Sequence, residues 1–249
     1  MSIFKNLTHA GLEETQDRTG GGFGAVEAGL YTGTIKLAYA GKSSGGAHNI
    51  TLVVALENGR EYTETIYITN KAGDNFYVKG DKKFPLPGFT TLDDICLVTS
   101  GKGLAEQDTE EKVVKIYDFD ASAELPKSVQ ALTDIMGQQI TLGILKTLTT
   151  KMQKDGNGAY TIPTDETREE NSTDKVFHSA SMMTTVEARQ GKTVGEFHTV
   201  WDEKNTGKTR DKTYKGNPGQ AGSTVKAGMP PMAGATQSAK KPSLFGPKA

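Results

Sequence analysis

Basic and aromatic side chains alternate repeatedly in the first third of the chain. The candidate ligand-binding residues fall into three groups: Lys36, Tyr39 and Lys42; Arg60, Tyr62 and Tyr67; and Lys71, Phe76, Tyr77, Lys79, Lys82, Lys83 and Phe84. Bases of single-stranded nucleic acid stack on aromatic rings, at ~1–3 kcal/mol each, while Lys and Arg follow the phosphates. Single aromatics such as Tyr39 are equally compatible with a buried position. The residues 76–84 are too many and too polar to point inward together, so they favour a surface that binds a single strand.

Two fragments resemble part of a phosphate-binding loop, namely Gly191-Lys-Thr193 and Gly207-Lys-Thr209. A complete loop needs a further glycine five residues before the Gly-Lys pair, because its backbone turns tightly around the phosphates. Val186 and Asp202 occupy those positions. The two fragments therefore do not predict nucleotide binding.

Catalytic and metal-binding patterns are weak. Asp118 and Asp120 lie two residues apart and could share a Mg²⁺ ion, which makes a metal-dependent nuclease one hypothesis. No third carboxylate has a convincing spacing, so a solvated strand edge is favoured. The four His are scattered, Cys96 is the single cysteine, and no serine lies in a nucleophile elbow. We expect no catalysis, no metal and no cofactor.

The composition changes at about Arg210. The segment 212–249 contains six Lys and no Asp or Glu, whereas the whole chain of 249 residues has a formal charge of −1, so the first 211 residues carry −7. The segment is rich in Gly, Pro, Ala, Ser and Thr and has too few large apolar residues to offset the entropy of ordering. We predict an N-terminal arm at 1–27, a folded domain at 28–210 and a disordered basic tail at 211–249.

The intervening elements are predicted from hydrophobic periodicity. Tyr31, Gly33, Ile35, Leu37 and Tyr39 alternate as in a half-buried strand, and residues 49–57 and 60–69 form two more strands around an Asn58-Gly59 hairpin turn. The residues that follow predict a loop at 70–89, a Thr-capped helix at 91–99 and a strand at 112–119. A short helix or loop is predicted at 125–136, and a strand with a bulge at Gly143 is predicted at 139–152. We further expect an exposed polar segment at 155–174 and β-type alternation at 196–201. This order predicts a mainly-β, five-stranded Greek-key barrel of the OB-fold type with insertions. A β-sandwich is the structural alternative.

The chain resembles the single-stranded DNA-binding proteins of tailed bacteriophages. The resemblance rests on the Tyr31-Thr-Gly33-Thr-Ile35-Lys36 strand, the meander with its Asn58-Gly59 turn, and a barrel followed by a low-complexity tail that ends near a Phe; it covers about residues 25–205. It implies an OB fold that coats single-stranded DNA cooperatively during replication and recombination, without catalysis. The tail departs from the family, because tails of that class are usually acidic and this one is basic.

Two classes of function remain open. The first is sequence-independent binding and protection of single-stranded DNA, with the protein as a homo-oligomer or a cooperative assembly and with phage or host replication proteins recruited through Leu244 and Phe245. The second is a β-rich structural protein of the virion, in the tail or in capsid decoration, without a nucleic-acid groove. No apolar run approaches the ~18 residues of a membrane span. The sequence therefore predicts a protein of the host cytoplasm, without a membrane partner.

Overall fold

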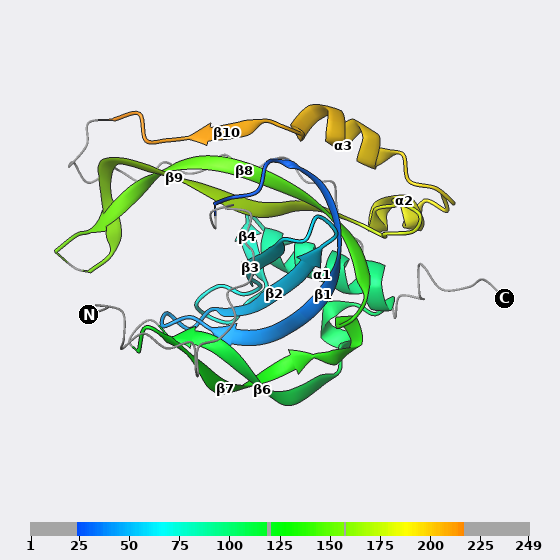
Figure 1. The fold of residues 1–249 in the computed structure, drawn as a ribbon, viewed down its shortest axis with the longest axis horizontal. Helices are drawn as coiled ribbons and strands as arrows, with labels where there is room; N and C mark the ends of the chain where they lie inside the picture. Colours follow the sequence, from blue (N-terminus) through cyan, green and yellow to red (C-terminus); the bar gives the residue numbers. More distant parts are fainter. Residues whose placement is uncertain (1–23, 119–120, 157, 217–249) are drawn as a thin grey trace, which may run out of the picture.

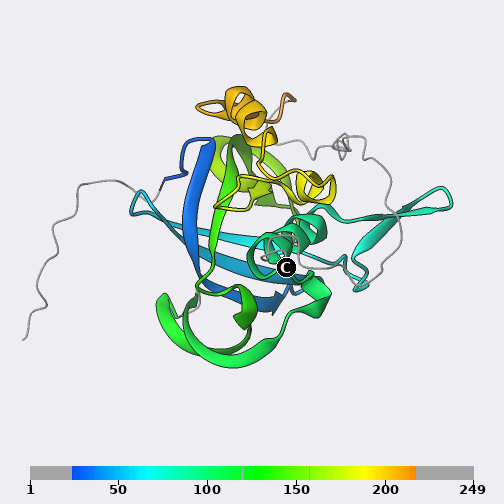
Figure 2. The ribbon, with the colours of Figure 1, turned by 90° about the vertical axis from the view of Figure 1, so that its right-hand side faces the viewer.

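The computed structural model describes residues 24–118, 121–156 and 158–216, which form a mainly antiparallel β structure with three α-helices at its sides (Figures 1 and 2). The large sheet contains β1 (Gly29–Lys42), β2 (His48–Leu56), β3 (Glu61–Tyr67), β6 (Thr109–Asp118), β7 (Ala123–Leu132), β8 (Gln139–Lys154), β9 (Tyr160–Phe177) and β10 (Thr209–Lys212). A second sheet consists of β4 (Phe76–Lys79) and β5 (Lys82–Pro85). The helices are α1 (Pro87–Ser100), α2 (Thr185–Arg189) and α3 (Phe197–Asn205), and the single 3₁₀ turns are η1 (Leu104–Glu106) and η2 (Thr133–Ile135).

The predicted three-stranded meander is confirmed. β1, β2 and β3 pair in sequence order and antiparallel, and Gly59 in the β2–β3 turn has φ +81°, a conformation that glycine adopts without strain. β2 was expected to be covered on both faces. Instead Leu52, Val54 and Leu56 are buried on one face, while Val53 and Ala55 on the other are half-buried.

A bulge in β1 changes which residues face the core. The register with β2 shifts between Ile35 and Leu37, so that the chain gains one residue and the alternation reverses. Ile35 and Ala38 are both fully buried, whereas Leu37 and Tyr39 are half-buried on the opposite face. The prediction that all five odd-numbered residues share one face therefore fails after Ile35, and Tyr39 gains access to the surface.

The strands do not close into the five-stranded barrel predicted from the sequence. The strands follow the path β3-β2-β1-β8-β9, and among the described residues β3 and β9 form no backbone ladder with each other. The two edges are connected through a side chain instead: the backbone N–H of Thr173 in β9 donates to the carboxylate of Glu64 in β3, at 3.1 Å. Because β9 diverges from β3 beyond this contact, the sheet stays open.

Helix α1 covers the inner face of the sheet. Leu92, Ile95, Cys96 and Val98 are buried against Ile50, Leu52, Val54, Ile66, Ile140, Leu142 and Val176. The helix begins at Pro87 after Leu86, not at a Thr cap near residue 91, because proline is well tolerated in the first turn of a helix. The single cysteine, Cys96, is part of this core, and burial raises the pKa of its thiol.

Several segments adopt a different structure from the one predicted. The expected loop at 70–89 contains the β4–β5 hairpin, the expected helix or loop at 125–136 is mostly β7, and the expected polar segment at 155–174 is mostly the long strand β9. Residues 196–201 belong mostly to α3, where Trp201 is buried. β7 is mostly exposed and β9 has few buried residues, so both strands are held mainly by backbone pairing with β6 and β8 and leave no hydrophobic period in the sequence.

The folded part extends past the boundary predicted at 210. β10 lies parallel to β8 and pairs Arg210 with Thr147 and Lys212 with Thr149, and the backbone N–H of Tyr214 donates to the hydroxyl of Thr150. All four β10 residues are exposed, so no burial pattern marks this strand.

At the N-terminal end of the described residues, Val26 is buried. Residues 1–23 of the arm predicted at 1–27 and residues 217–249 of the tail predicted at 211–249 lie outside the described residues. Within the described ranges, no helix combines the length and apolar character that a membrane span requires.

Candidate nucleic-acid interface

The outer face of the β1–β2–β3 meander brings together two of the predicted aromatic residues. Tyr39 of β1 pairs with Thr51 of β2, and Thr51 pairs with Thr65 of β3, so the three side chains share one face. Tyr67 lies two residues after Thr65 and therefore points to the same face. Tyr39 is half-buried and Tyr67 is 52% exposed. With β2 between them, the two strands lie about 10 Å apart. The two rings therefore stand on one surface, opposite the core, and bases can reach both.

Two predicted cations lie toward the other end of this meander and already have partners. Lys36, at the bulge, forms an ion pair with Glu61 at 2.8 Å, and both side chains are about half exposed. The guanidinium of Arg60 donates to the backbone carbonyl of Gly24. An exposed pair of this kind contributes at most about 1 kcal/mol, so a phosphate can compete for Lys36.

Tyr62 does not belong to this surface, and its prediction as a stacking residue is wrong. The ring is 5% exposed and belongs to the core, and its hydroxyl donates to Glu64 at 2.8 Å. Burial, reinforced by the neighbouring carboxylate of Glu64, raises the pKa of this phenol. The alternation of β3 places Tyr62 and Ile66 inward, and Tyr67 outward.

Lys42 and Lys71 both lie at the end of the meander nearer to Tyr67. Lys42 pairs with His48 across the β1–β2 connection, and the backbone N–H of His48 donates to the hydroxyl of Thr69. The alkyl stem of Lys71 lies against Gly45 in the same connection. The turn after β1 and the loop after β3 are thereby side by side, and each contributes one lysine.

The β4–β5 hairpin carries the other six predicted residues and projects from the body of the molecule (Figure 2). Tyr77 and Phe84 are paired across the strands and their rings stack, with centroids 5.5 Å apart. On the opposite face, the ammonium group of Lys83 lies 4.2 Å from the centroid of the Phe76 ring. The hairpin therefore presents aromatic surface on both sides.

Lysines at the hairpin tip face each other rather than carboxylates. Lys79 is directly opposite Lys82, on the same face as Tyr77 and Phe84. Lys79, Lys82 and Lys83 are exposed, and none of them forms an ion pair with the described part of the chain. Like charges in directly opposite positions destabilise a hairpin. A bound polyanion would relieve this repulsion.

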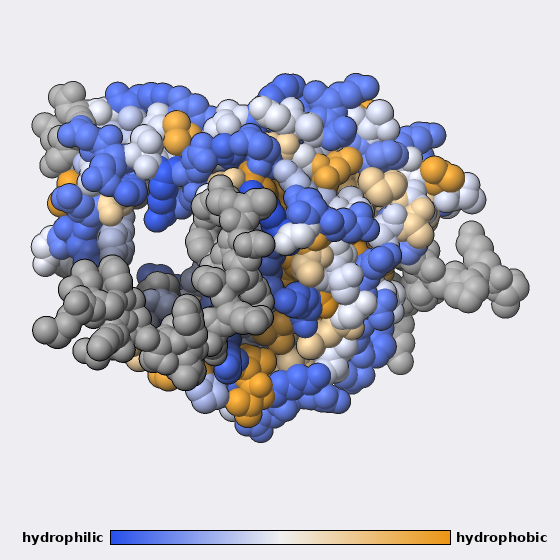
Figure 3. All heavy atoms as spheres, viewed as in Figure 1, coloured by the Kyte–Doolittle hydropathy of each residue, from blue (hydrophilic) through white to orange (hydrophobic). Residues whose placement is uncertain are grey.

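The structure adds exposed residues that sequence reasoning missed. The tip of the β8–β9 ribbon carries Tyr160, 67% exposed, with the ammonium of Lys154 5.4 Å from its ring centroid. The β6–β7 ribbon carries Tyr117, 50% exposed, and Val113, 72% exposed. Both ribbons extend to the same side in Figure 1, and the space-filling view shows an opening beneath β8–β9 (Figure 3). The strands at 112–119 and 139–152 were predicted from the sequence, but their partners β7 and β9, which complete the two ribbons, were not.

The weaker sequence motifs do not assemble into a catalytic centre in the described residues. Asp118 forms an ion pair with Lys127 at 2.9 Å, and Asp120 lies outside the described residues. Gly191-Lys-Thr193 follows α2, and Gly207-Lys-Thr209 leads into β10 rather than into a helix. Within the described ranges, no group of three or more His, Cys, Asp and Glu side chains has an arrangement that could hold a metal ion.

No protein-family model matches the chain, and no curated protein matches it with significant sequence similarity.

Proposed function

We propose that this protein binds single-stranded DNA without sequence preference and without catalysis, as a coating protein in phage DNA replication and recombination. The observation that carries the proposal is the β4–β5 hairpin. It combines stacked Tyr77 and Phe84 with three lysines that make no ion pair in the described structure, and it follows β3 directly after Tyr67 and Lys71. Stacking platforms beside unneutralised cations are the combination that single strands require.

The strand order supports an OB-type fold as part of this proposal. In an OB fold, an antiparallel three-stranded meander leads through a helix to two further strands, and the barrel is partly open. Here β1, β2 and β3 precede α1, β8 pairs with β1, and β9 pairs with β8. The hairpins β4–β5 and β6–β7 are then insertions. Oligonucleotides bind OB folds over strands 2 and 3 and the flanking loops, the region that holds Tyr67, Lys42 and Lys71.

The net negative charge of the folded part limits the ways in which the protein can attract DNA. Because the first 211 residues carry a formal charge of −7, a general positive field does not attract DNA. Binding must depend on the local group formed by Lys42, Lys71 and the hairpin lysines. We therefore expect affinity to fall with salt, with a slope set by a small number of phosphate contacts.

One observation favours the alternative of a structural virion protein. The β6–β7 ribbon exposes Val113, Tyr117 and Leu125, and exposed apolar side chains on an extended ribbon suit contact with another protein. Such a protein would assemble through its ribbons and would leave the β4–β5 lysines without a ligand.

Fluorescence anisotropy separates the two functions. A labelled 30-nucleotide oligo-dT and a labelled duplex of the same length are titrated with the full chain at two salt concentrations. We expect tighter binding to the single strand, a similar affinity for an unstructured strand of mixed sequence, and weaker binding at the higher salt. Equal affinity for single strand and duplex, or no binding to either, would contradict the proposal.

A further inference from the structure

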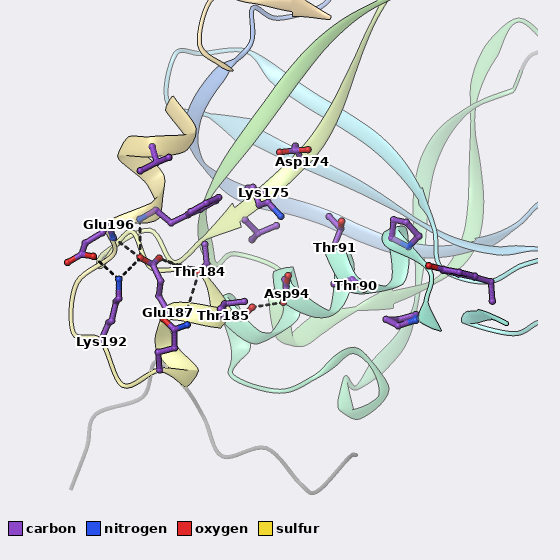
Figure 4. A pocket seen from close by; sticks show the side chains of 18 residues that line it. Thr90, Thr91, Asp94, Asp174, Lys175, Thr184, Thr185, Glu187, Lys192 and Glu196 are labelled. Atoms are coloured by element: carbon purple, nitrogen blue, oxygen red, sulfur yellow. Dashed lines mark hydrogen bonds and ion pairs between the residues drawn. The ribbon is translucent and has the colours of Figure 1, made fainter. Parts of the chain in front are cut away.

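A cavity lies away from the outer face of the meander, between elements that are distant in the sequence (Figure 4). Its volume is about 660 Å³, and its walls come from the β4–β5 hairpin, the first turns of α1, the end of β9, α2 and α3. This volume falls in the range of sites that bind small molecules or a few residues of peptide. The apolar lining consists of Tyr77, Pro85, Pro87, Val176, Val186, Phe197 and Val200.

The apolar side chains at the mouth of this cavity are incompletely covered. Val186 is 56% exposed, Val200 is 58% exposed and Phe197 is 39% exposed, although all three line the same depression. Short helices normally bury such residues, and here α2 and α3 leave them facing a gap. The site is therefore suited to one or two large apolar side chains from another segment.

The polar rim of the cavity is predominantly acidic. Asp94, Asp174, Glu187 and Glu196 line it together with only two cations, Lys175 and Lys192 (Figure 4). Lys192 is already engaged by Glu196 at 2.7 Å, Asp174 accepts from the Trp201 indole at 2.7 Å, and Glu187 is buried and accepts from backbone N–H groups. Asp94 accepts a hydrogen bond from Thr185 and forms no ion pair within the described ranges. An occupant with positive charge beside an apolar anchor would complement this rim.

The C-terminal sequence of the same chain has both properties. Residues 217–249 contain four Lys and no acidic residue, and Leu244-Phe245 supplies their only Leu and only aromatic side chain. Lys240 and Lys241 precede this pair and Lys248 follows it. The charge pattern around Leu244-Phe245 thus matches the acidic rim around Val186 and Val200.

The length of the segment permits docking within one molecule. From Gly216, the last described residue, to Leu244 there are 28 residues. A Gly-rich chain of this length has a root-mean-square span of about 30 Å, and its fully extended length of roughly 90 Å exceeds the dimensions of a domain of this size. A short tether gives an effective concentration in the millimolar range, so even a weak contact would be substantially occupied.

We propose that the cavity between α1, α2 and α3 is the docking site for the chain's own C-terminal segment, with Leu244 and Phe245 in the apolar part and the flanking lysines at the acidic rim. This proposal does not depend on DNA binding. It gives the tail an intramolecular partner, in contrast to the recruitment of another protein expected from the sequence.

The first test uses a fluorescein-labelled peptide with the sequence of residues 238–249. It is titrated by anisotropy into the full chain and into a full-chain variant, Leu244→Ala/Phe245→Ala, whose own tail cannot compete. We expect the peptide to bind the variant at least fivefold more tightly than it binds the wild-type protein, and to bind more weakly at high salt. A peptide with both anchors replaced by alanine should not bind. The tether gives the tail an effective concentration of roughly 1 mM. Absence of peptide binding to the variant at about 1 mM peptide would therefore overturn the proposal.

Matched substitutions locate the site. In the tail-disabled background, Val186→Asp should weaken peptide binding at least tenfold, whereas Val113→Asp, at an equally exposed valine on β6, should not change it. Val200→Asp replaces Val186→Asp if circular dichroism shows that the latter does not fold. An equal loss in the Val113 variant, or no loss in either pocket variant, would overturn the assignment.

Hydrogen exchange distinguishes docking within a molecule from docking between copies. Amides of residues 184–200 should be better protected in the wild-type chain than in Leu244→Ala/Phe245→Ala, to the same extent from 1 to 50 µM protein. Protection that appears only as the concentration rises would place the tail in a neighbouring copy and would overturn the intramolecular proposal.

Discussion

Gly143 of β8 lies directly against the indole of Trp201 of α3. A Cβ atom at position 143 would approach Cε2 and Cζ2 of the ring to 3.0 Å. The indole has little freedom to move, because it is 3% exposed and its Nε1–H donates to Asp174 at 2.7 Å. The absence of a side chain at position 143 of β8 is thus what allows α3 to pack on the sheet.

Replacing Gly143 by alanine should destabilise the protein. The new methyl group must displace a buried, hydrogen-bonded ring, and overpacking of this kind costs about 1–3 kcal/mol. Chemical denaturation followed by Trp201 fluorescence measures the change. Gly156→Ala is the matched control, since a Cβ there meets no atom within 4 Å, and a loss of equal size in the control would refute the steric explanation.

Removing the two facing lysines of the hairpin should weaken the salt-dependent part of DNA binding without lowering the stability of the protein. In Lys79→Ala/Lys82→Ala, two phosphate contacts are lost, so the slope of log K against log salt for oligo-dT should become shallower by about 1.4. Because like charges across a strand pair repel, thermal stability should stay the same or rise slightly. The control Lys115→Ala/Lys204→Ala removes two other exposed lysines without a described ion pair. The same change of slope in that control would show that the place of the lysines on the hairpin does not matter for DNA binding.

Loss of the Tyr67 ring should weaken binding by a different route. Tyr67→Ala removes a stacking surface worth ~1–3 kcal/mol, which is roughly a 5- to 150-fold loss of affinity, and leaves the salt slope unchanged. The substitution should not perturb the fold, because the ring is half exposed. Unchanged affinity in Tyr67→Ala would exclude this face of the meander from the interface.

Ionised Glu187 should stabilise the region around the cavity. Burial, the largest single influence, disfavours the charge, but hydrogen bonds from the backbone N–H groups of Glu196, Thr184 and Phe197 and from the Thr184 hydroxyl outweigh it and lower the pKa to about 2. Glu187→Gln should therefore reduce the free energy of unfolding at pH 7 by about 1–3 kcal/mol.

The same variant should show a defined pH dependence. A folded-state pKa below the unfolded value of about 4.3 means that the stabilisation is present above that pH and is lost as the pH falls toward 2. The difference between wild type and Glu187→Gln should shrink over this window in urea titrations. Glu196→Gln, at a largely exposed carboxylate, should change stability by no more than about 0.5 kcal/mol at any pH, and a difference for Glu187 that is constant with pH would show that its charge is not responsible.

Elements with a buried face or a strong turn signal were predictable from the sequence alone. β1, β2, β3 and the first half of β8 carry apolar residues at strand spacing, and Asn58-Gly59 specifies its hairpin locally. In each case, the information lies within a few neighbouring residues. A register shift does fall at Gly143 as predicted, but the extra residue is Asp174 of the partner strand β9 and not a residue of β8.

Only the tertiary structure decided the rest. The polar strands β9 and β10 exist because β8 offers them backbone partners, and α3 packs on the sheet because Gly143 leaves room for Trp201. The bulge after Ile35 turned Tyr39 outward, and the alternation of β3 placed Tyr62 in the core. The acidic cavity joins residues more than 100 positions apart. These outcomes depend on contacts between distant segments, and a local pattern of residue types does not encode which segments will meet.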